Sequence, residues 1–94
     1  MSDLAQLNRL IEAVLAGEIS FGQFDGTFGF TYYELPVHVM RSQAASFVSA
    51  VCEKREFVTD QPTEAEREEG WIDPSDYLRW LREEWDRRQV RPAL

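Results

Sequence analysis

Signals for the start of a helix recur along this chain and divide it into helical segments. Residues that commonly cap helices stand before apolar patterns at Asp3, Ser20 and Asp73, and Thr63 stands before a short charged run. Their side chains can accept hydrogen bonds from backbone N–H groups that the first turn of a helix leaves unpaired. Pro36 marks a further start, because its fixed φ angle suits the first helical turn. The pattern predicts an all-α protein.

The first predicted helix covers residues 4–15. Gln6 lies three positions after the cap Asp3, as in a capping box, and Gly17 lies just past the last apolar residue, where a left-handed glycine closes many helices. The apolar residues recur at steps of three and four and share one face: Leu4, Leu7, Leu10, Ile11, Val14 and Leu15. We therefore expect a helix with one buried face.

Residues 21–34 fit either a helix or a β-hairpin. Ser20 and Gln23 repeat the capping-box pattern, whereas Asp25-Gly26 is a strong signal for a two-residue hairpin turn. A helix would place a set of aromatic side chains on one face: Phe21, Phe24, Phe28 and Tyr32. A hairpin would instead alternate Phe28, Phe30 and Tyr32. We favour the helix and leave the hairpin open.

Glycines lie beside the aromatic face of this second helix, at Gly22, Gly26 and Gly29. Each costs a helix about 1 kcal/mol relative to alanine. They would either let a neighbouring helix approach closely or simply weaken their own helix, and the sequence does not separate these alternatives.

Longer helices are predicted on either side of the acidic stretch. The third helix runs from Pro36 to about Lys54, and the last opens with Asp73 and Pro74 and runs to about Arg88. The inner face of the third helix comprises Val37, Met40, Ala44, Phe47, Val48 and Val51. The inner face of the last helix comprises Tyr77, Leu78, Leu81 and Trp85. Trp80 projects more than about 100° away from that face, so we expect it to be exposed.

The expected architecture is an antiparallel four-helix bundle with a short extra helical turn in the third connection. Thr63 with Glu66 predicts this extra turn, which stops at Gly70. A chain of 94 residues has the size of one domain. We expect a single helical domain over residues 1–94, with residues 88–94 frayed.

The chain is strongly acidic, with 17 acidic residues, 10 basic residues and a formal charge of −7. This balance opposes binding to a phosphate backbone, because few cations are present to replace condensed counterions. It favours a basic protein, whose approach an acidic surface speeds at low salt. No apolar run approaches the ~18 residues that span a bilayer, and residues 1–6 lack a signal-peptide pattern. We expect a cytoplasmic protein with neither nucleic acid nor membrane as partner.

Few residues suit catalysis or metal binding. Cys52 is the only cysteine, which excludes an internal disulfide, and His38 is the only histidine. Both fall on the predicted third helix, about 20 Å apart along its axis, and so they cannot form a catalytic dyad. The stretch from Asp60 to Asp76 lacks the alternating oxygen ligands of a calcium loop. We expect no enzymatic activity, no catalytic residue, no metal and no cofactor.

Acidity is concentrated between Glu56 and Asp76, where eight acidic residues accompany one basic residue, Arg67. This segment is either a solvated face that serves solubility or a docking surface for a cationic site. In the second interpretation its carboxylates replace phosphates, and Trp71 and Trp80 act as apolar anchors among the charges. The candidate partner-binding residues are Glu53, Glu56, Asp60, Glu64, Glu66, Glu68, Glu69, Trp71, Asp73, Asp76 and Trp80.

Two stretches of the sequence carry a resemblance to a known family. The first is LIEAVLAGEISFGQFDGTF, residues 10–28, in which an apolar helix end, a break and a phenylalanine-containing helix follow one another. The second is CEKREFVTD, residues 52–60, a charged helix end that leads into an Asp-containing loop. Together with the acidic cap and the final helix, these stretches resemble the bacterial colicin D type immunity proteins.

The resemblance implies a function. Proteins of that family are small acidic helical bundles that bind a toxin nuclease, typically one that cleaves transfer RNA, and their acidic side chains fill its basic active site. Carried over to this chain, the resemblance implies inhibitory roles for Glu53 or Glu56 together with Asp60. The expected partner is then the basic nuclease domain of a bacteriocin or of a contact-dependent growth inhibition toxin, and we expect a monomer. The alternative is an acidic adaptor module that binds another cellular protein through Trp80 and its flanking carboxylates.

Overall fold

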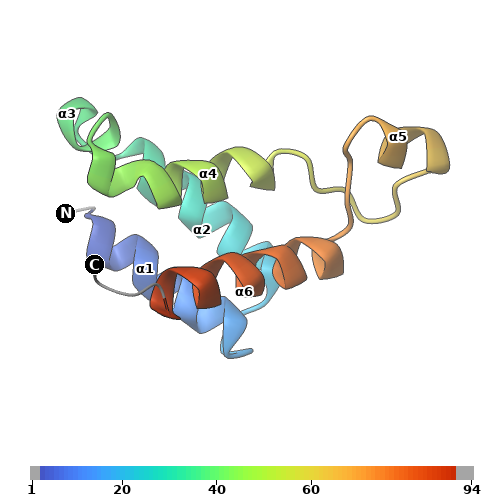
Figure 1. Ribbon diagram of the computed structural model, residues 1–94, viewed down its shortest axis with the longest axis horizontal. Coiled ribbons are helices and arrows are strands. Elements are labelled where there is room, and N and C mark those ends of the chain that lie inside the picture. The colour runs from blue at the N-terminus through green and yellow to red at the C-terminus, as the bar shows by residue number, and fades with distance from the viewer. Residues whose placement is uncertain (1–2, 91–94) are drawn as a thin grey trace. The chain divides into compact units, whose positions relative to one another are not determined.

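The regular secondary structure of the chain is helical. The computed structural model describes residues 3–90, and within that range it contains no β-strand (Figure 1). Its elements are α1 (Leu4–Leu15), α2 (Phe21–Tyr33), α3 (Val37–Met40), the 3₁₀ helix η1 (Gln43–Ala45), α4 (Ser46–Arg55), α5 (Glu64–Glu68) and α6 (Pro74–Val90). The all-α prediction is confirmed. By its contacts the chain forms two compact units, residues 1–56 and residues 57–94.

Helix α1 begins and ends at the residues that the sequence indicates. The Asp3 carboxylate accepts a hydrogen bond from the Gln6 backbone N–H at 2.8 Å. Gly17 follows the helix with a φ of +78°, a conformation that glycine adopts without a steric penalty. The apolar face is buried at Leu7, Ile11 and Val14.

Residues 21–33 form helix α2, so the hairpin alternative is wrong. Ser20 and Gln23 form a complete capping box, in which Ser20 Oγ accepts from the Gln23 N–H at 3.1 Å and Gln23 Oε1 accepts from the Ser20 N–H at 2.9 Å. Phe24 and Phe28 are fully buried, with their ring centroids 5.0 Å apart. Burial of these rings on one face outweighs the cost of the glycines and the local turn signal at Asp25-Gly26.

The predicted third helix is not continuous. The chain forms α3, η1 and α4 in its place, because Ser42 adopts an extended backbone and its hydroxyl donates to the Val39 carbonyl. The break shifts the helical register, so Ala45 is buried and Ala44 is exposed. Val37, predicted on the inner face, is 63% exposed.

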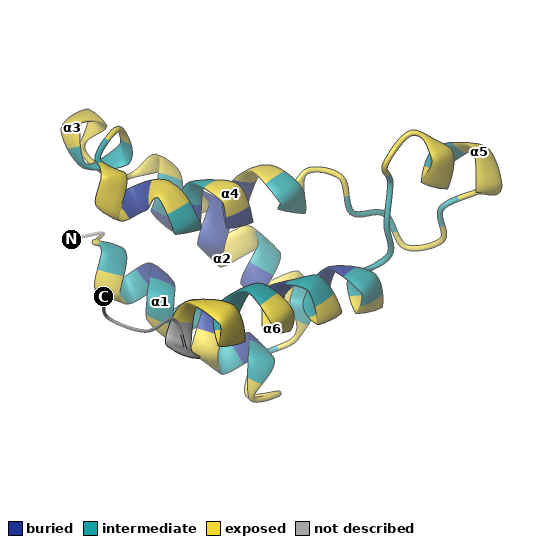
Figure 2. Ribbon diagram, in the orientation of Figure 1, coloured by how far each residue is buried: buried dark blue, intermediate teal, exposed yellow. Residues whose placement is uncertain are grey.

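The core of the first unit lies between α1, α2 and α4. Helix α1 packs against α2 and α4, and α2 packs against α4. Figure 2 shows buried residues on the sides of these helices that face one another. The buried side chains of this unit are Leu7, Ile11, Val14, Phe24, Phe28, Thr31, Leu35, Ala45, Val48, Val51 and Cys52.

One charged side chain is built into the first unit. The guanidinium of Arg55 donates to Asp25 Oδ1 at 2.9 Å, and the Arg55 side chain is only 15% exposed. Burial alone would lower the pKa of Arg55, but its hydrogen bonds to Asp25 and Cys52 outweigh this effect and raise that pKa. The guanidinium lies directly over Gly29, where a Cβ atom would come within 2.7 Å of Arg55 Nη2.

The contact with Arg55 shows which of the α2 glycines allows a close approach. Gly29 provides room for an arginine side chain rather than for the backbone of another helix. Gly22 and Gly26 are exposed, and a Cβ atom at Gly26 would have no neighbour within 4 Å. Close packing therefore needs only one of the three glycines.

The second unit contains α5 and α6 and a loop closed at its base. Val58 and Ile72 form an isolated parallel bridge, in which the Thr59 N–H donates to the Ile72 carbonyl at 2.8 Å and the Ile72 N–H donates to the Phe57 carbonyl at 3.0 Å. Helix α5 is the extra turn that was predicted in the third connection, and it begins with a capping box between Thr63 and Glu66.

Helix α6 begins at Pro74, as predicted. Tyr77 and Leu81 are fully buried, while Leu78 and Trp85 are half-buried. The helix continues to Val90, and residues 91–94 lie outside the described range, so the fraying expected for residues 88–94 stays a prediction. The single domain over residues 1–94 stays a prediction. None of the helices in the described range is long and apolar enough to cross a membrane.

The contact between Gly29 and Arg55 predicts opposite outcomes for two alanine substitutions. Gly26→Ala should raise the free energy of unfolding by up to about 1 kcal/mol, because alanine favours the helix and meets no neighbour. Gly29→Ala should give no such gain, since its Cβ displaces the guanidinium that pairs with Asp25. Urea unfolding of both variants measures the difference.

An Arg55→Ala background provides the control. Without the guanidinium, Gly29→Ala should recover the gain seen for Gly26→Ala. Equal stabilisation by both substitutions in the natural chain would contradict the close contact.

Candidate functional site

The predicted partner-binding residues belong to different parts of the fold. Glu53 lies in the last turn of α4 and Glu56 caps it, both in the first unit. The remaining candidates belong to the second unit: Asp60, Glu64, Glu66, Glu68, Glu69, Trp71, Asp73, Asp76 and Trp80. Each of the two groups therefore belongs to a different unit of the fold.

Residues 57–72 form an ordered loop, called here the acidic loop. Its base is held by the Val58–Ile72 bridge and by the rings of Phe57 and Trp71, whose centroids lie 5.7 Å apart. Its tip is formed by α5, and the Trp71 N–H donates back to the Glu66 carbonyl at 3.0 Å. Gly70, with a φ of +104°, allows the chain to turn back after α5.

Some of the candidate carboxylates are used within the second unit. Glu66 accepts from the Thr63 N–H at 2.8 Å as part of the capping box. Arg67 donates to Asp76 at 2.9 Å and to Asp73 at 3.3 Å, and Arg79 donates to the other oxygen of Asp76 at 3.3 Å. These groups hold α5 to the start of α6.

Asp73 is also the cap of α6. Its carboxylate accepts from the Asp76 backbone N–H at 2.8 Å. This hydrogen bond is the main reason that the pKa of Asp73 is lowered from its ordinary value of 3.8; slight burial opposes it, and the bond from Arg67 adds to it. The pKa of Arg67 is raised in turn, chiefly by its hydrogen bond to Asp76.

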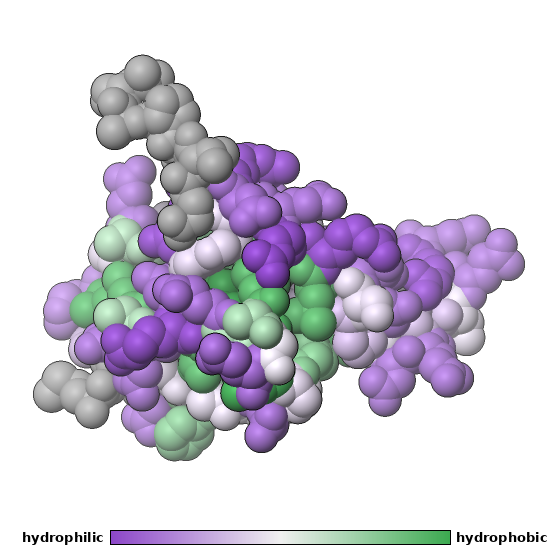
Figure 3. All heavy atoms as spheres, turned by 90° about the horizontal axis from the view of Figure 1, so that it is seen from below, coloured by the Kyte–Doolittle hydropathy of each residue, from purple (hydrophilic) through white to green (hydrophobic). Residues whose placement is uncertain are grey.

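The remaining carboxylates of the acidic loop are exposed. They are Asp60, Glu64, Glu68 and Glu69. The only basic residue of the loop, Arg67, is directed to Asp73 and Asp76 and so does not neutralise them. Figure 3 shows a mostly hydrophilic surface over this end of the second unit. The loop therefore presents uncompensated negative charge to solvent.

The predicted tryptophan anchors are only partly accessible. Trp71 is half-buried and packs on Phe57 at the base of the acidic loop. Trp80 is half-buried, with its ring 5.6 Å from that of Tyr77, whereas its position on the helix predicted an exposed side chain. Their role as anchors stays a prediction.

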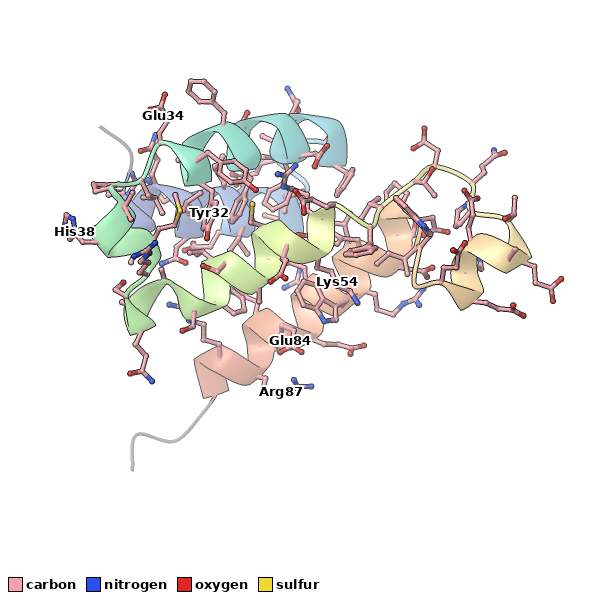
Figure 4. The ribbon with its side chains drawn as sticks, turned by 90° about the horizontal axis from the view of Figure 1, so that it is seen from above. Tyr32, Glu34, His38, Lys54, Glu84 and Arg87 are labelled. Atoms are coloured by element: carbon pink, nitrogen blue, oxygen red, sulfur yellow. The ribbon has the colours of Figure 1, made fainter. Side chains whose placement is uncertain are left out.

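A hollow of about 220 Å³ opens on the first unit, and the sequence did not indicate it. Figure 4 shows Tyr32 between α2 and α4, and the Tyr32 hydroxyl shares a hydrogen bond of 2.8 Å with Ser49 Oγ. Lys54 lies on the opposite side of α4 from Tyr32 (Figure 4). The lining residues come from α2, α3 and α4: Tyr32, Tyr33, Met40, Ser49, Cys52, Glu53 and Glu56.

Tyr33 is the part of this hollow that was hardest to foresee. The sequence pattern placed Tyr32 on the aromatic face of α2 and assigned no role to Tyr33. The Tyr33 side chain is 61% exposed and lines the hollow. Charge interactions with Cys52 and then Glu56, followed by slight burial, raise the pKa of Tyr33 above its ordinary value, and Arg55 opposes this shift. The sequence pattern from which the hollow could have been inferred is the adjacent pair Tyr32-Tyr33 in α2 together with Glu53 and Glu56 at the end of α4.

His38 and Cys52 lie on separate helices, α3 and α4, so the 20 Å spacing expected from one continuous helix does not apply. His38 is exposed and points away from the hollow, whereas Cys52 is buried (Figure 4). Among the described residues, no three His, Cys, Asp or Glu side chains are grouped so that they could hold a metal ion.

Comparisons of this chain with protein-family models, curated proteins and solved structures give no match. The resemblance to the colicin D type immunity proteins therefore depends on the two quoted stretches and the order of the helices.

The hydrogen bonds of Asp73 predict an effect of Arg67 on its titration. Arg67→Gln should raise the pKa of Asp73 toward 3.8 but not fully to it, because the Asp76 N–H still donates to the carboxylate. Carboxyl NMR titration measures this change. Arg79→Gln, which removes a contact of Asp76 only, should leave the pKa of Asp73 unchanged.

The same hydrogen bonds predict a pH dependence of stability. Because its pKa is lower in the folded chain than the ordinary 3.8, ionised Asp73 stabilises the fold above pH 3.8. This contribution is lost as the pH falls through the lowered folded pKa. Arg67→Gln should therefore reduce the pH dependence of unfolding in acid, and an unchanged dependence would contradict the assigned contacts.

Proposed function

We propose that this chain is an immunity protein that binds and occludes the basic active site of a bacterial toxin nuclease. The cognate toxin would be a tRNase of the bacteriocin or contact-dependent growth inhibition type. The single observation that carries the proposal is the acidic loop, which is closed at its base and presents Asp60, Glu64, Glu68 and Glu69 to solvent. The net charge of −7 and the sequence resemblance support the same partner chemistry.

The mechanism is substitution of carboxylates for phosphates. A nuclease that cleaves RNA binds the phosphate backbone through cationic side chains, and carboxylates accept the same charge-assisted hydrogen bonds. Exposed carboxylates also speed the encounter with a basic protein at low salt. The inhibitor would thus arrive quickly and exclude RNA from the site.

The closed base of the acidic loop supports this mechanism. The Val58–Ile72 bridge, the packing of Phe57 on Trp71 and the contacts of Arg67 limit the conformations of the loop before a partner binds. A loop that is already ordered loses less conformational entropy on association. Glu66, Asp73 and Asp76 then serve as supports of the loop as well as candidate contacts.

Further parts of the proposal follow from the sequence. The chain would act as a cytoplasmic monomer without enzymatic activity, and its helices would form an antiparallel four-helix bundle with α5 as the extra turn. Glu53 and Glu56 would bind the same partner from the end of α4. Trp71 and Trp80 would contribute apolar contacts around the charges.

The alternative function is an acidic adaptor that binds another cellular protein through Trp80. The genomic position separates the two functions, because an immunity protein should be encoded directly after a large reading frame with a basic C-terminal domain. The direct test is to express that C-terminal domain in cells with and without this chain. Restored growth, together with co-purification of the two proteins, is the expected result, and growth arrest despite a stable chain would reject the proposal.

The role of the acidic loop predicts a loss of association rate on neutralisation. The loop variant carries Asp60→Asn, Glu64→Gln, Glu68→Gln and Glu69→Gln. Its association rate with the nuclease domain should fall by roughly 10- to 100-fold at low salt, because the proposed function places these four carboxylates opposite the basic site of the partner. Stopped-flow kinetics at several salt concentrations measure the effect.

A variant with the same change in net charge provides the control. It carries Glu12→Gln, Glu18→Gln, Glu83→Gln and Asp86→Asn, all at exposed positions outside the acidic loop. The association rate of the control should fall several-fold less than that of the loop variant. Equal losses would show that only net charge matters and would remove the loop from the mechanism.

A further inference from the structure

The hollow on the first unit combines an aromatic wall with carboxylates. The hydrogen bond of 2.8 Å to Ser49 fixes the ring of Tyr32, and the ring of Tyr33 meets it edge-on with centroids 5.2 Å apart. Tyr33 remains 61% exposed. The π-face of a tyrosine attracts a cation that lies within about 6 Å of the ring.

Glu53 and Glu56 supply the negative charge of the hollow. Both are exposed and lie three positions apart, at the C-terminal end of α4. Negative side chains are unfavourable there, because the unpaired carbonyl groups of a helix end already carry partial negative charge. A bound cation would relieve this repulsion, so the placement favours a positively charged occupant.

The basic residues of α4, Lys54 and Arg55, are not among the residues that line the hollow. Arg55 pairs with Asp25 at 2.9 Å, and its guanidinium lies over Gly29. Lys54 projects from the opposite side of α4 (Figure 4). Arg55 is therefore directed to Asp25, and Lys54 to the other side of the helix.

The size and shape of the hollow limit which chemical groups can occupy it. A volume of about 220 Å³ lies below the range of roughly 300–1,000 Å³ that is typical of small-molecule pockets, so the hollow suits one side chain. A guanidinium can stack flat on an aromatic ring and donate in a fork to carboxylates, which an ammonium group cannot do. Phe30, which is 70% exposed and lies three positions before Tyr33 on α2, adds apolar surface for the neighbouring part of a partner.

We propose that this hollow is a socket for one arginine side chain of the partner protein, stacked on Tyr33 and paired with Glu53 and Glu56. The identity of the partner depends on the proposed function, whereas the chemistry of the socket does not. The socket adds a specific contact at short range, distinct from the attraction that the acidic loop exerts at long range.

The test uses the full chain and small probes in place of the partner. N-acetyl-arginine methylamide should bind saturably in the millimolar range and shift the NMR signals of the Tyr32 and Tyr33 rings and of the Glu53 and Glu56 amides. The citrulline analogue has the same shape without the charge and should bind at least about fivefold more weakly. Equal binding of the two probes, or unsaturable shifts at acidic residues throughout the chain, would overturn the socket. Equal binding of the lysine analogue would overturn its assignment to arginine.

Matched variants locate the binding. Glu53→Gln combined with Glu56→Gln should weaken the arginine probe at least about fivefold, while Glu12→Gln combined with Glu18→Gln should change it less than about twofold. Tyr33→Leu should also weaken binding of the probe, whereas Phe30→Leu, which replaces another exposed aromatic residue of α2, should not. All these residues are exposed, and circular dichroism verifies that each variant keeps its helices. Equal effects of the paired variants would overturn the proposed location.

The probe titration separates this proposal from the proposed function. Arginine binding at the hollow without growth protection would reject the nuclease partner and retain the socket. Growth protection with no binding of the arginine probe would retain the partner and reject the socket.

Discussion

Two arginines determine how this acidic chain distributes its charge. Arg55 pairs with Asp25 inside the first unit, and Arg67 pairs with Asp73 and Asp76 in the second. Each arginine is used to hold helices or loops in place, so neither neutralises the carboxylates that remain at the surface. Exposed negative charge consequently remains at the acidic loop and at the hollow beside Tyr33, as well as at scattered positions such as Glu12 and Glu83.

In the proposed function, the acidic loop and the hollow serve different stages of recognition. Charges on an exposed loop act over several ångströms and mainly affect the rate of encounter, and salt weakens them. A hollow with an aromatic wall acts only in contact and mainly affects how long a complex lasts. An inhibitor of a toxic enzyme needs both rapid capture and slow release.

The sequence predicted the parts of the fold that depend on local rules. The caps at Asp3, Ser20 and Thr63 and the closing glycines Gly17 and Gly70 are all where the pattern placed them. The third helix was predicted as continuous because its apolar spacing continues through Ser42, whereas the hydroxyl of Ser42 bonds to the Val39 carbonyl and ends α3. A single side-chain hydrogen bond of this kind leaves no trace in hydrophobic periodicity.

The candidate site was predictable in composition but not in arrangement. Local charge density identified the segment that becomes the acidic loop, but not the fact that Arg67 would take up Asp73 and Asp76 and leave the others exposed. The hollow depends on Tyr32 and Tyr33 meeting residues from α4, about twenty positions along the chain, and only the folded structure brings these together. The requirement for glycine at position 29 was not predictable for the same reason, because it comes from the contact with Arg55.

The central claim is that this chain occupies the site where a nuclease binds RNA. The most direct measurement is transfer RNA binding to a catalytically inactive form of the nuclease domain encoded upstream, with increasing amounts of this chain. The account predicts competition, in which saturating chain displaces the RNA completely and RNA lowers the apparent affinity for the chain. A stable complex that contains nuclease, RNA and this chain together would contradict it.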